Sequence, residues 1–213
     1  MVKKYVVGID EVGRGSLAGP VIVVAAMMPM NSKSLIANSK LGTLKDSKGL
    51  TAKQREAWSA YFLAHPKIEY ALARVYPRTI ERINIANATN LAAFRATKRL
   101  IAKGISQGGS KKRFAIRDSR HAIYLDGGLY LGSKKAQPKH ARTIIGGDES
   151  ITSIKVASII AKVNRDRSMV KLAKKYPKYG FEIHKGYGTK RHMAAIKKYG
   201  ASKVHRKTFI ANV

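Results

Sequence analysis

The sequence feature that most restricts the fold is an apolar run at residues 6–9, Val-Val-Gly-Ile, followed at once by Asp10 and Glu11. Such a run fits a β-strand buried in a core. Two consecutive carboxylates at the end of a core strand are costly to bury unless a partner compensates their charge. A divalent metal ion is the most direct partner, because hard cations prefer oxygen ligands and let carboxylates lie beside phosphate groups.

Two further predicted strands end in the same way. Residues 122–125 lead into Asp126, and residues 141–145 lead through two glycines into Asp148. If the three strands are neighbours in one sheet, their acids meet at one edge and can share one or two metal ions, as phosphoryl transfer requires. Adjacent residues of a regular strand point to opposite faces, so we also expect the first strand to end or bulge at Asp10. The predicted catalytic and metal-binding carboxylates are Asp10, Glu11, Asp126 and Asp148.

The charge of the chain indicates a polyanionic partner. The sequence has 42 lysines and arginines against 12 acids, a formal net charge of +30, which favours nucleic acid as partner and, through self-repulsion, a monomer. The apolar stretch at residues 21–30 is too short to span a bilayer and contains Pro29, so we expect no transmembrane segment and no membrane partner. The start of the chain lacks the apolar run of a signal peptide, which predicts a cytoplasmic protein. The absence of cysteine excludes disulfides and thiolate metal sites.

Hydrophobic periodicity and helix-breaking residues predict alternating strands and helices in one domain of 213 residues. Strands are predicted at residues 5–9, 17–28, 68–76, 122–125 and 141–145. Helices are predicted at residues 52–64 with Thr51 as N-cap, at 80–102 in two pieces with Gly104 as a stop, at 150–175 and at 189–199. Loops are predicted at residues 38–50, 107–120 and 176–188.

Seven short motifs occur in order along almost the whole chain. They are Gly-Ile-Asp-Glu-Val-Gly-Arg-Gly at residues 8–15, Leu-Ala-Gly-Pro at 17–20, Leu-Lys-Asp-Ser-Lys at 44–48, Leu-Asp-Gly at 125–127, Gly-Asp at 147–148, Ala-Ser-Ile-Ile-Ala-Lys-Val-Asn-Arg-Asp at 157–166 and His-Lys-Gly-Tyr at 184–187. Together they resemble the type 2 ribonuclease H family, ribonuclease HII. Dispersed motifs in the right order are a more specific signal than any one of them.

The resemblance implies an α/β fold with an RNase H-like mixed sheet flanked by helices. It implies a catalytic core at residues 1–175, and a C-terminal loop and helix at 176–213 that complete the substrate-binding face within a single domain. The implied activity is that of an endonuclease that hydrolyses the RNA strand of RNA/DNA hybrids and incises 5′ to single ribonucleotides in duplex DNA, as in ribonucleotide excision repair. Mg²⁺ or Mn²⁺ is the implied cofactor, in two-metal-ion catalysis that leaves 3′-hydroxyl and 5′-phosphate ends.

The resemblance also implies which residues recognise the substrate. The backbone of the glycine-arginine-glycine triplet approaches the 2′-hydroxyl, which distinguishes RNA from DNA. The tyrosine stacks on the sugar of the following deoxynucleotide, and the two lysines contact phosphates. These substrate-binding residues are Gly13, Arg14, Gly15, Lys48, Lys162 and Tyr187.

One histidine in these motifs has an expected structural role, and other positions depart from the family pattern. His184 is expected to form structural hydrogen bonds and to take no part in catalysis. Ser16 replaces the proline usual after the triplet, and Gly146 stands where a lysine is common. The basic segment at residues 108–120 is longer than usual. The chain stops soon after Phe209 without an evident sliding-clamp motif, so we expect no clamp partner.

Three other interpretations are open at this point. A type 3 ribonuclease H resembles this group, but has an additional N-terminal domain and lacks the triplet. A DNA nuclease or junction resolvase on the same fold would share the acids without the triplet and Tyr187, and would cut duplex DNA with and without a ribonucleotide alike. A non-catalytic basic protein, such as a ribosomal or nucleoid protein, would bind in a salt-sensitive way without metal-dependent cleavage.

Overall fold

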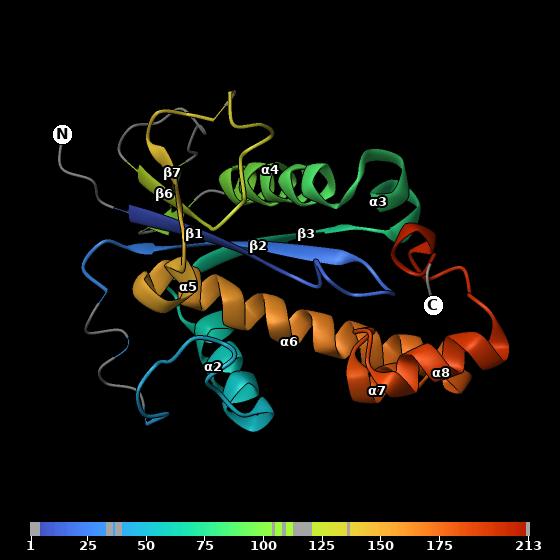
Figure 1. Ribbon diagram of the computed structural model, residues 1–213. Helices are drawn as coiled ribbons and strands as arrows, with labels where there is room; N and C mark the ends of the chain where they lie inside the picture. Colours follow the sequence, from blue (N-terminus) through green and yellow to red (C-terminus); the bar gives the residue numbers. More distant parts are fainter. Residues whose placement is uncertain are drawn as a thin grey trace.

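The centre of the fold is a five-stranded mixed sheet (Figure 1). The computed structural model describes residues 5–32, 36, 40–103, 105–107, 110–112, 121–135 and 137–211. In the sheet order β3-β2-β1-β6-β7, the strands are β3 (Glu69–Val75), β2 (Val21–Pro29), β1 (Tyr5–Val12), β6 (His121–Asp126) and β7 (Ala141–Ile144). β1, β6 and β7 run parallel, whereas β2 is antiparallel to both of its neighbours. The three strands predicted to lead into the acids are therefore adjacent.

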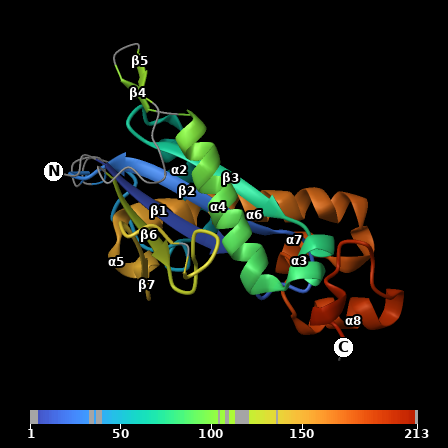
Figure 2. The ribbon, with the colours of Figure 1, turned by 90° about the horizontal axis from the view of Figure 1, so that it is seen from above.

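Helices cover both faces of this sheet. The helices are α2 (Ala52–Ala64), α3 (Pro77–Ile83), α4 (Ile85–Lys103), α5 (Gly147–Ser150), α6 (Thr152–Lys175), α7 (Phe181–His184) and α8 (Lys190–Tyr199), with 3-10 turns η1 (Pro177–Tyr179) and η2 (Lys207–Phe209). Figures 1 and 2 show α4 on one face of the sheet and α2 and α6 on the other. The predicted α/β class, a mixed sheet flanked by helices with a C-terminal helical region, is confirmed.

Strand β2, which lies between β3 and β1, explains why two cores form. Every residue from Val21 to Met28 is buried, because the strand is covered on both faces. Side chains alternate along it, so Val23 and Ala25 enter the core under α4, whereas Val24 and Ala26 enter the core under α2 and α6.

A glycine in β1 brings the long helix α6 close to the sheet. A Cβ atom on Gly8 would lie 2.0 Å from the carbonyl carbon of Ser153, at the start of α6. Five apolar residues of this helix are buried: Ile154, Ala157, Ile160, Ala161 and Val163. The helix is thus pressed against the strand that carries Asp10 and Glu11.

The C-terminal segment returns to the loop that follows β1. Leu17 N donates to Gly186 O at 2.8 Å, and Arg206 N donates to Leu17 O at 2.8 Å. Gly19 N donates to Val204 O at 2.9 Å. The loop after β1 and the C-terminal segment are therefore hydrogen-bonded to each other.

Several local predictions agree with the structure. Thr51 is the N-cap of α2 and forms a capping box with Gln54. The helix predicted at residues 80–102 is divided at Asn84, whose φ of 61° is left-handed, into α3 and α4. Gly104, the predicted stop, lies outside the described residues. Residues 40–50 form no helix or strand, as predicted, and residues 38 and 39 lie outside the described part. No described helix is long and apolar enough to cross a membrane.

Other local predictions were wrong in detail. β1 does not end or bulge at Asp10, because it pairs residue by residue with β2 as far as Val12 opposite Ile22. The loop predicted at residues 107–120 contains strand β5 (Ser110–Lys112), which pairs with β4 (Ile105–Gln107), and residues 113–120 lie outside the described part. The loop predicted at 176–188 contains η1 and α7.

Candidate active site

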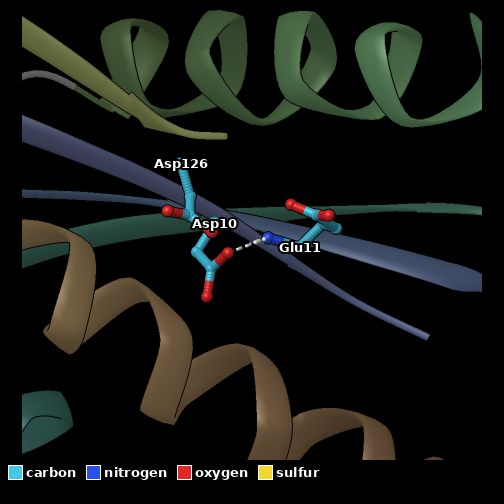
Figure 3. Close-up of side chains that lie close together, drawn as sticks. All are labelled: Asp10, Glu11 and Asp126. Atoms are coloured by element: carbon cyan, nitrogen blue, oxygen red, sulfur yellow. Dashed lines mark hydrogen bonds between the residues drawn. The ribbon is translucent and has the colours of Figure 1, made fainter. Parts of the chain in front are cut away.

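Three carboxylates meet where β1 passes the end of β6. β1 carries Asp10 and Glu11, and β6 ends at Asp126. One carboxylate oxygen of each residue lies within 4.8 Å of the other two, and Figure 3 shows the three side chains around this point. β1 pairs with β6 only as far as Ile9 and Leu125. Because β6 does not continue beside them, Asp10 and Glu11 approach the same point although they leave β1 on opposite faces.

Two of these acids hold their protons more tightly than isolated carboxyl groups do. Burial raises the pKa of Asp10 well above its usual value, and the charges of Glu11 and Asp126 raise it further, against hydrogen bonds from Ser158 and the backbone of Glu11. Burial also raises the pKa of Glu11 to about 7. Arg14 Nη1 opposes that shift from 3.7 Å, whereas the charge of Asp126 reinforces it.

The oxygens of this group fit a divalent cation. Glu11 Oε2 is buried and has no hydrogen-bond partner among the described residues. Carboxylates this close repel one another when ionised, and burial adds to that cost. A cation held by Asp10, Glu11 and Asp126 would give the unpaired oxygen a ligand role and would favour the ionised forms.

Asp148, the fourth predicted acid, lies beside this group. It belongs to the short helix α5 and not to the end of a strand, since β7 already ends at Ile144. Its amide donates to Asp126 Oδ1 at 3.3 Å, and its Oδ2 lies 3.2 Å from Lys48 Nζ. A Cβ at position 147 would come within 2.5 Å of the Ile154 side chain, so the preceding glycine permits this close approach. Asp148 therefore faces the site from α5, with Lys48 as its counter-ion.

The acids line a cleft of about 400 Å³. The structure places all the predicted site residues in its lining: Asp10, Glu11, Gly13, Arg14, Gly15, Lys48, Asp126, Asp148, Lys162 and Tyr187. Four lining residues were not predicted, namely Val12, Ser47, Arg55 and Ser158. Ser47 and Ser158 lie inside the motifs at residues 44–48 and 157–166, so the motifs carried a signal for them, whereas Arg55 had none.

Three of the unpredicted residues, Ser47, Ser158 and Arg55, hold the loop that carries Lys48. Ser47 Oγ lies 2.8 Å from Ser158 Oγ, and this buried pair joins the loop to α6. Arg55 Nη1 donates to Ser47 O at 2.9 Å from the side of α2. Lys162, the other predicted lysine, donates from Nζ to Asp166 Oδ1 at 2.9 Å. The two lysines thus bring positive charge to the cleft from different elements.

The triplet at residues 13–15 forms the wall next to the acids. Gly13 has a φ of 85°, and a Cβ there would lie 2.4 Å from the Arg165 guanidinium. Gly15 is exposed, and a Cβ there would meet no atom within 4 Å. Ser16, at the family's usual proline position, is fully buried. The fold therefore requires glycine at position 13, whereas the space beside Gly15 is open.

Tyr187 also lines the cleft, on the segment after α7. Its backbone is fixed, because its amide donates to His184 O at 3.0 Å and its carbonyl lies 2.9 Å from His192 Nδ1. The Lys162 ammonium is 5.9 Å from the centre of its ring. His184 is buried outside the cleft lining, with Nε2 2.7 Å from Tyr179 O, which agrees with the structural role expected for it.

Comparison with known proteins gives consistent results. The family model of ribonuclease HII matches residues 7–212. Ribonuclease HII of Coxiella burnetii (strain Dugway 5J108-111) is 39% identical over 204 residues, which cover 96% of this chain and 87% of that protein. Ribonuclease H2 from Pyrococcus horikoshii OT3 superposes with a TM-score of 0.65 at 24% identity, over 96% of this chain and 93% of that one. Bst-RNase HIII in complex with Mn²⁺ superposes with a TM-score of 0.67 at 20% identity, over 98% of this chain and 65% of that one.

Proposed function

The chain belongs to the ribonuclease HII family and is a ribonuclease H that acts on RNA/DNA hybrids, and we propose that it also incises duplex DNA on the 5′ side of a single embedded ribonucleotide. The cut would leave 3′-hydroxyl and 5′-phosphate ends and would begin the excision of the ribonucleotide. The observation that carries this proposal is the cleft itself, where the carboxylate group and the glycine-arginine-glycine triplet share one lining.

We propose Asp10, Glu11, Asp126 and Asp148 as the residues that hold Mg²⁺ or Mn²⁺. The unpaired Glu11 Oε2 and the close approach of three carboxylates support this assignment, and a protein of similar fold is known in complex with Mn²⁺. When bound, such ions supply an activated water and stabilise the leaving 3′ oxygen in an in-line displacement. Asp126 also accepts the Asp148 amide, so the acid of α5 and the acid of β6 are held in a fixed relation.

The other cleft residues are proposed to select and orient the substrate. The backbone of the triplet approaches the 2′-hydroxyl, and the open space beside Gly15 leaves room for the sugar. Tyr187, which is 36% exposed, offers its ring to the sugar of the next nucleotide. Lys48 and Lys162 neutralise backbone phosphates. No protein nucleophile takes part, so the chain's own contribution is to hold, orient and compensate charge.

The metal assignment is tested by removing one carboxylate charge at a time. Asp10→Asn and Asp126→Asn should each abolish cleavage of a single-ribonucleotide duplex while leaving its Kd in chelator unchanged, because neither substitution removes a basic contact. Glu56→Gln is the matched control, since Glu56 pairs with Arg167 on the surface, and it should cleave normally. Turnover at the wild-type rate in both aspartate variants would reject the proposed metal site.

A further inference from the structure

Two arginines lie fully buried below the triplet. Arg165 of α6 and Arg206, which precedes η2, are both 0% exposed. No carboxylate in the described part of the chain lies within ion-pair distance of either guanidinium. Burial, and then the charge of Arg165, lower the pKa of Arg206 to about 9. Two cations buried together are costly, so other groups must compensate them.

Backbone carbonyls of the loop after β1 provide that compensation. Arg206 donates from Nη2 to Gly13 O at 2.7 Å and from Nη1 to Arg14 O at 2.8 Å. Its Nε and Nη2 also donate to Gly19 O, at 3.1 and 2.9 Å. Arg165 donates instead to the carbonyls of Ala18, Pro20 and Lys185. Arg206 therefore binds the carbonyls of the triplet itself, whereas Arg165 binds the segment behind it.

Because the peptide bond is planar, the direction of these carbonyls also fixes the direction of the amides that follow them. In a trans peptide the C=O and the next N–H point in opposite directions. Because the carbonyls of Gly13 and Arg14 point at the buried guanidinium, the amides of Arg14 and Gly15 point away from it. These two amides have no acceptor among the described residues, and both residues line the cleft. Two adjacent outward N–H groups backed by buried positive charge form a donor pair suited to an oxygen ligand.

We infer that Arg206 is a positioning residue for ribose recognition, which holds the two triplet carbonyls inward so that the amides of Arg14 and Gly15 meet the 2′ oxygen of the substrate. This inference rests on the proposed incision at ribonucleotides. Lysine is not an equivalent residue at this position. The planar guanidinium presents its donors in a fixed fork that reaches three carbonyls at once, whereas an ammonium group presents a compact point charge.

The test compares Arg206→Lys with Arg165→Lys, since both replace a buried arginine bonded to loop carbonyls. For each variant, kcat and KM are measured on a duplex with one ribonucleotide, and the same duplex without it serves as competitive inhibitor. Arg206→Lys should lower kcat/KM by about tenfold, the size of one or two lost hydrogen bonds, while the inhibition constant of the all-DNA duplex stays unchanged. Arg165→Lys should keep the ratio of inhibition constant to KM seen in the wild type.

Additional measurements separate positioning from loss of the fold. Thermal melts should show a comparable decrease in Tm for both buried variants, and Mn²⁺ affinity of the full chain should match the wild type. Arg95→Lys, an exposed change on α4, should alter nothing. If Arg206→Lys keeps the wild-type preference for the ribonucleotide, or if Arg165→Lys loses it to the same extent, the inference is wrong. A wild type that cuts both duplexes alike would instead refute the proposed function.

Discussion

At the scale of single residues, Gly13 and Gly15 have different surroundings and give a direct comparison. An alanine methyl at position 15 would meet no protein atom within 4 Å. At position 13 it would clash with the Arg165 guanidinium, and the φ of 85° there is unfavourable for alanine. Gly15→Ala should therefore leave Tm unchanged but lower kcat/KM on a single-ribonucleotide duplex about tenfold or more, because the methyl occupies space kept for the sugar. Gly13→Ala should cost about 2 kcal/mol or more of stability. Equal losses of Tm in both variants would contradict this account of the triplet.

Glu11 predicts how stability depends on pH when no metal is bound. Its pKa rises from 4.5 to about 7 on folding, so the folded state disfavours the ionised form. That penalty is absent below the unfolded pKa, grows as pH rises from the unfolded to the folded pKa, and is complete above it. In chelator, Glu11→Gln should match the wild type near pH 4 and exceed its free energy of unfolding by about 3 kcal/mol at pH 8. Urea denaturation at both pH values measures this, and saturating Mg²⁺ should cancel the difference, whereas a difference independent of pH would contradict it.

The sequence predicted the residues that line the cleft better than the residues that hold them in place. The acids, the triplet and Tyr187 lie in short local motifs, which can be found without knowing the fold. Ser158 and Arg206 act through partners far along the chain, since Ser47 is 111 residues from Ser158 and Gly13 is 193 residues from Arg206. Such contacts depend on tertiary packing, which no local pattern encodes.

At the scale of elements, the approach of α6 to β1 positions one side of the site. Gly8 leaves no space for a side chain, because a Cβ would lie 2.0 Å from the Ser153 carbonyl carbon. Gly8→Ala should push α6 away from the sheet and cost about 2 to 4 kcal/mol, since backbone must move. The same shift should lower activity, because α6 carries Ser158 and Lys162. Melts and kcat measure both effects, and a stable, fully active Gly8→Ala would show that this packing does not position the site.

Elements were predicted best where an apolar run or a cap marks a whole segment. Helix α2 has the predicted bounds and N-cap, whereas the strand predicted at residues 17–28 begins only at Val21, as β2. The short helix α5 was missed, because its four residues follow the strand-like run at 141–145 without a polar break or a side-chain cap. Asp148 was therefore predicted at a strand end, although it lies on a helix beside the carboxylate group.

At the scale of the whole molecule, the net charge of +30 predicts strongly salt-dependent binding. Each phosphate neutralised by lysine or arginine adds about −0.9 to the slope of log binding constant against log salt. The cleft lining contributes Arg14, Lys48, Arg55 and Lys162, and α8 adds further exposed basic residues. We expect a slope of about −5 or steeper for an all-DNA duplex in chelator, unchanged in Asp10→Asn. A slope of about −1 in fluorescence-anisotropy titrations would mean that the charge serves another purpose.

The convergence of distant segments also belongs to this scale. The sequence predicted that acids from three segments would meet, and the parallel arrangement of β1, β6 and β7 confirms that these strands are neighbours. It did not predict that residues 204–206 would bond to residues 17–19 and complete the wall of the triplet. The predicted division of the domain after residue 175 stays a prediction.

The most direct test of the central claim is a cleavage assay on two DNA duplexes that differ only in one ribonucleotide, each with Mg²⁺, with Mn²⁺ and with chelator. We expect the ribonucleotide-containing duplex alone to be cut, on the 5′ side of that residue, with at least one of the two metals and never in chelator. Cutting of both duplexes alike, or cutting that persists in chelator, would contradict a metal-dependent nuclease that recognises the 2′-hydroxyl.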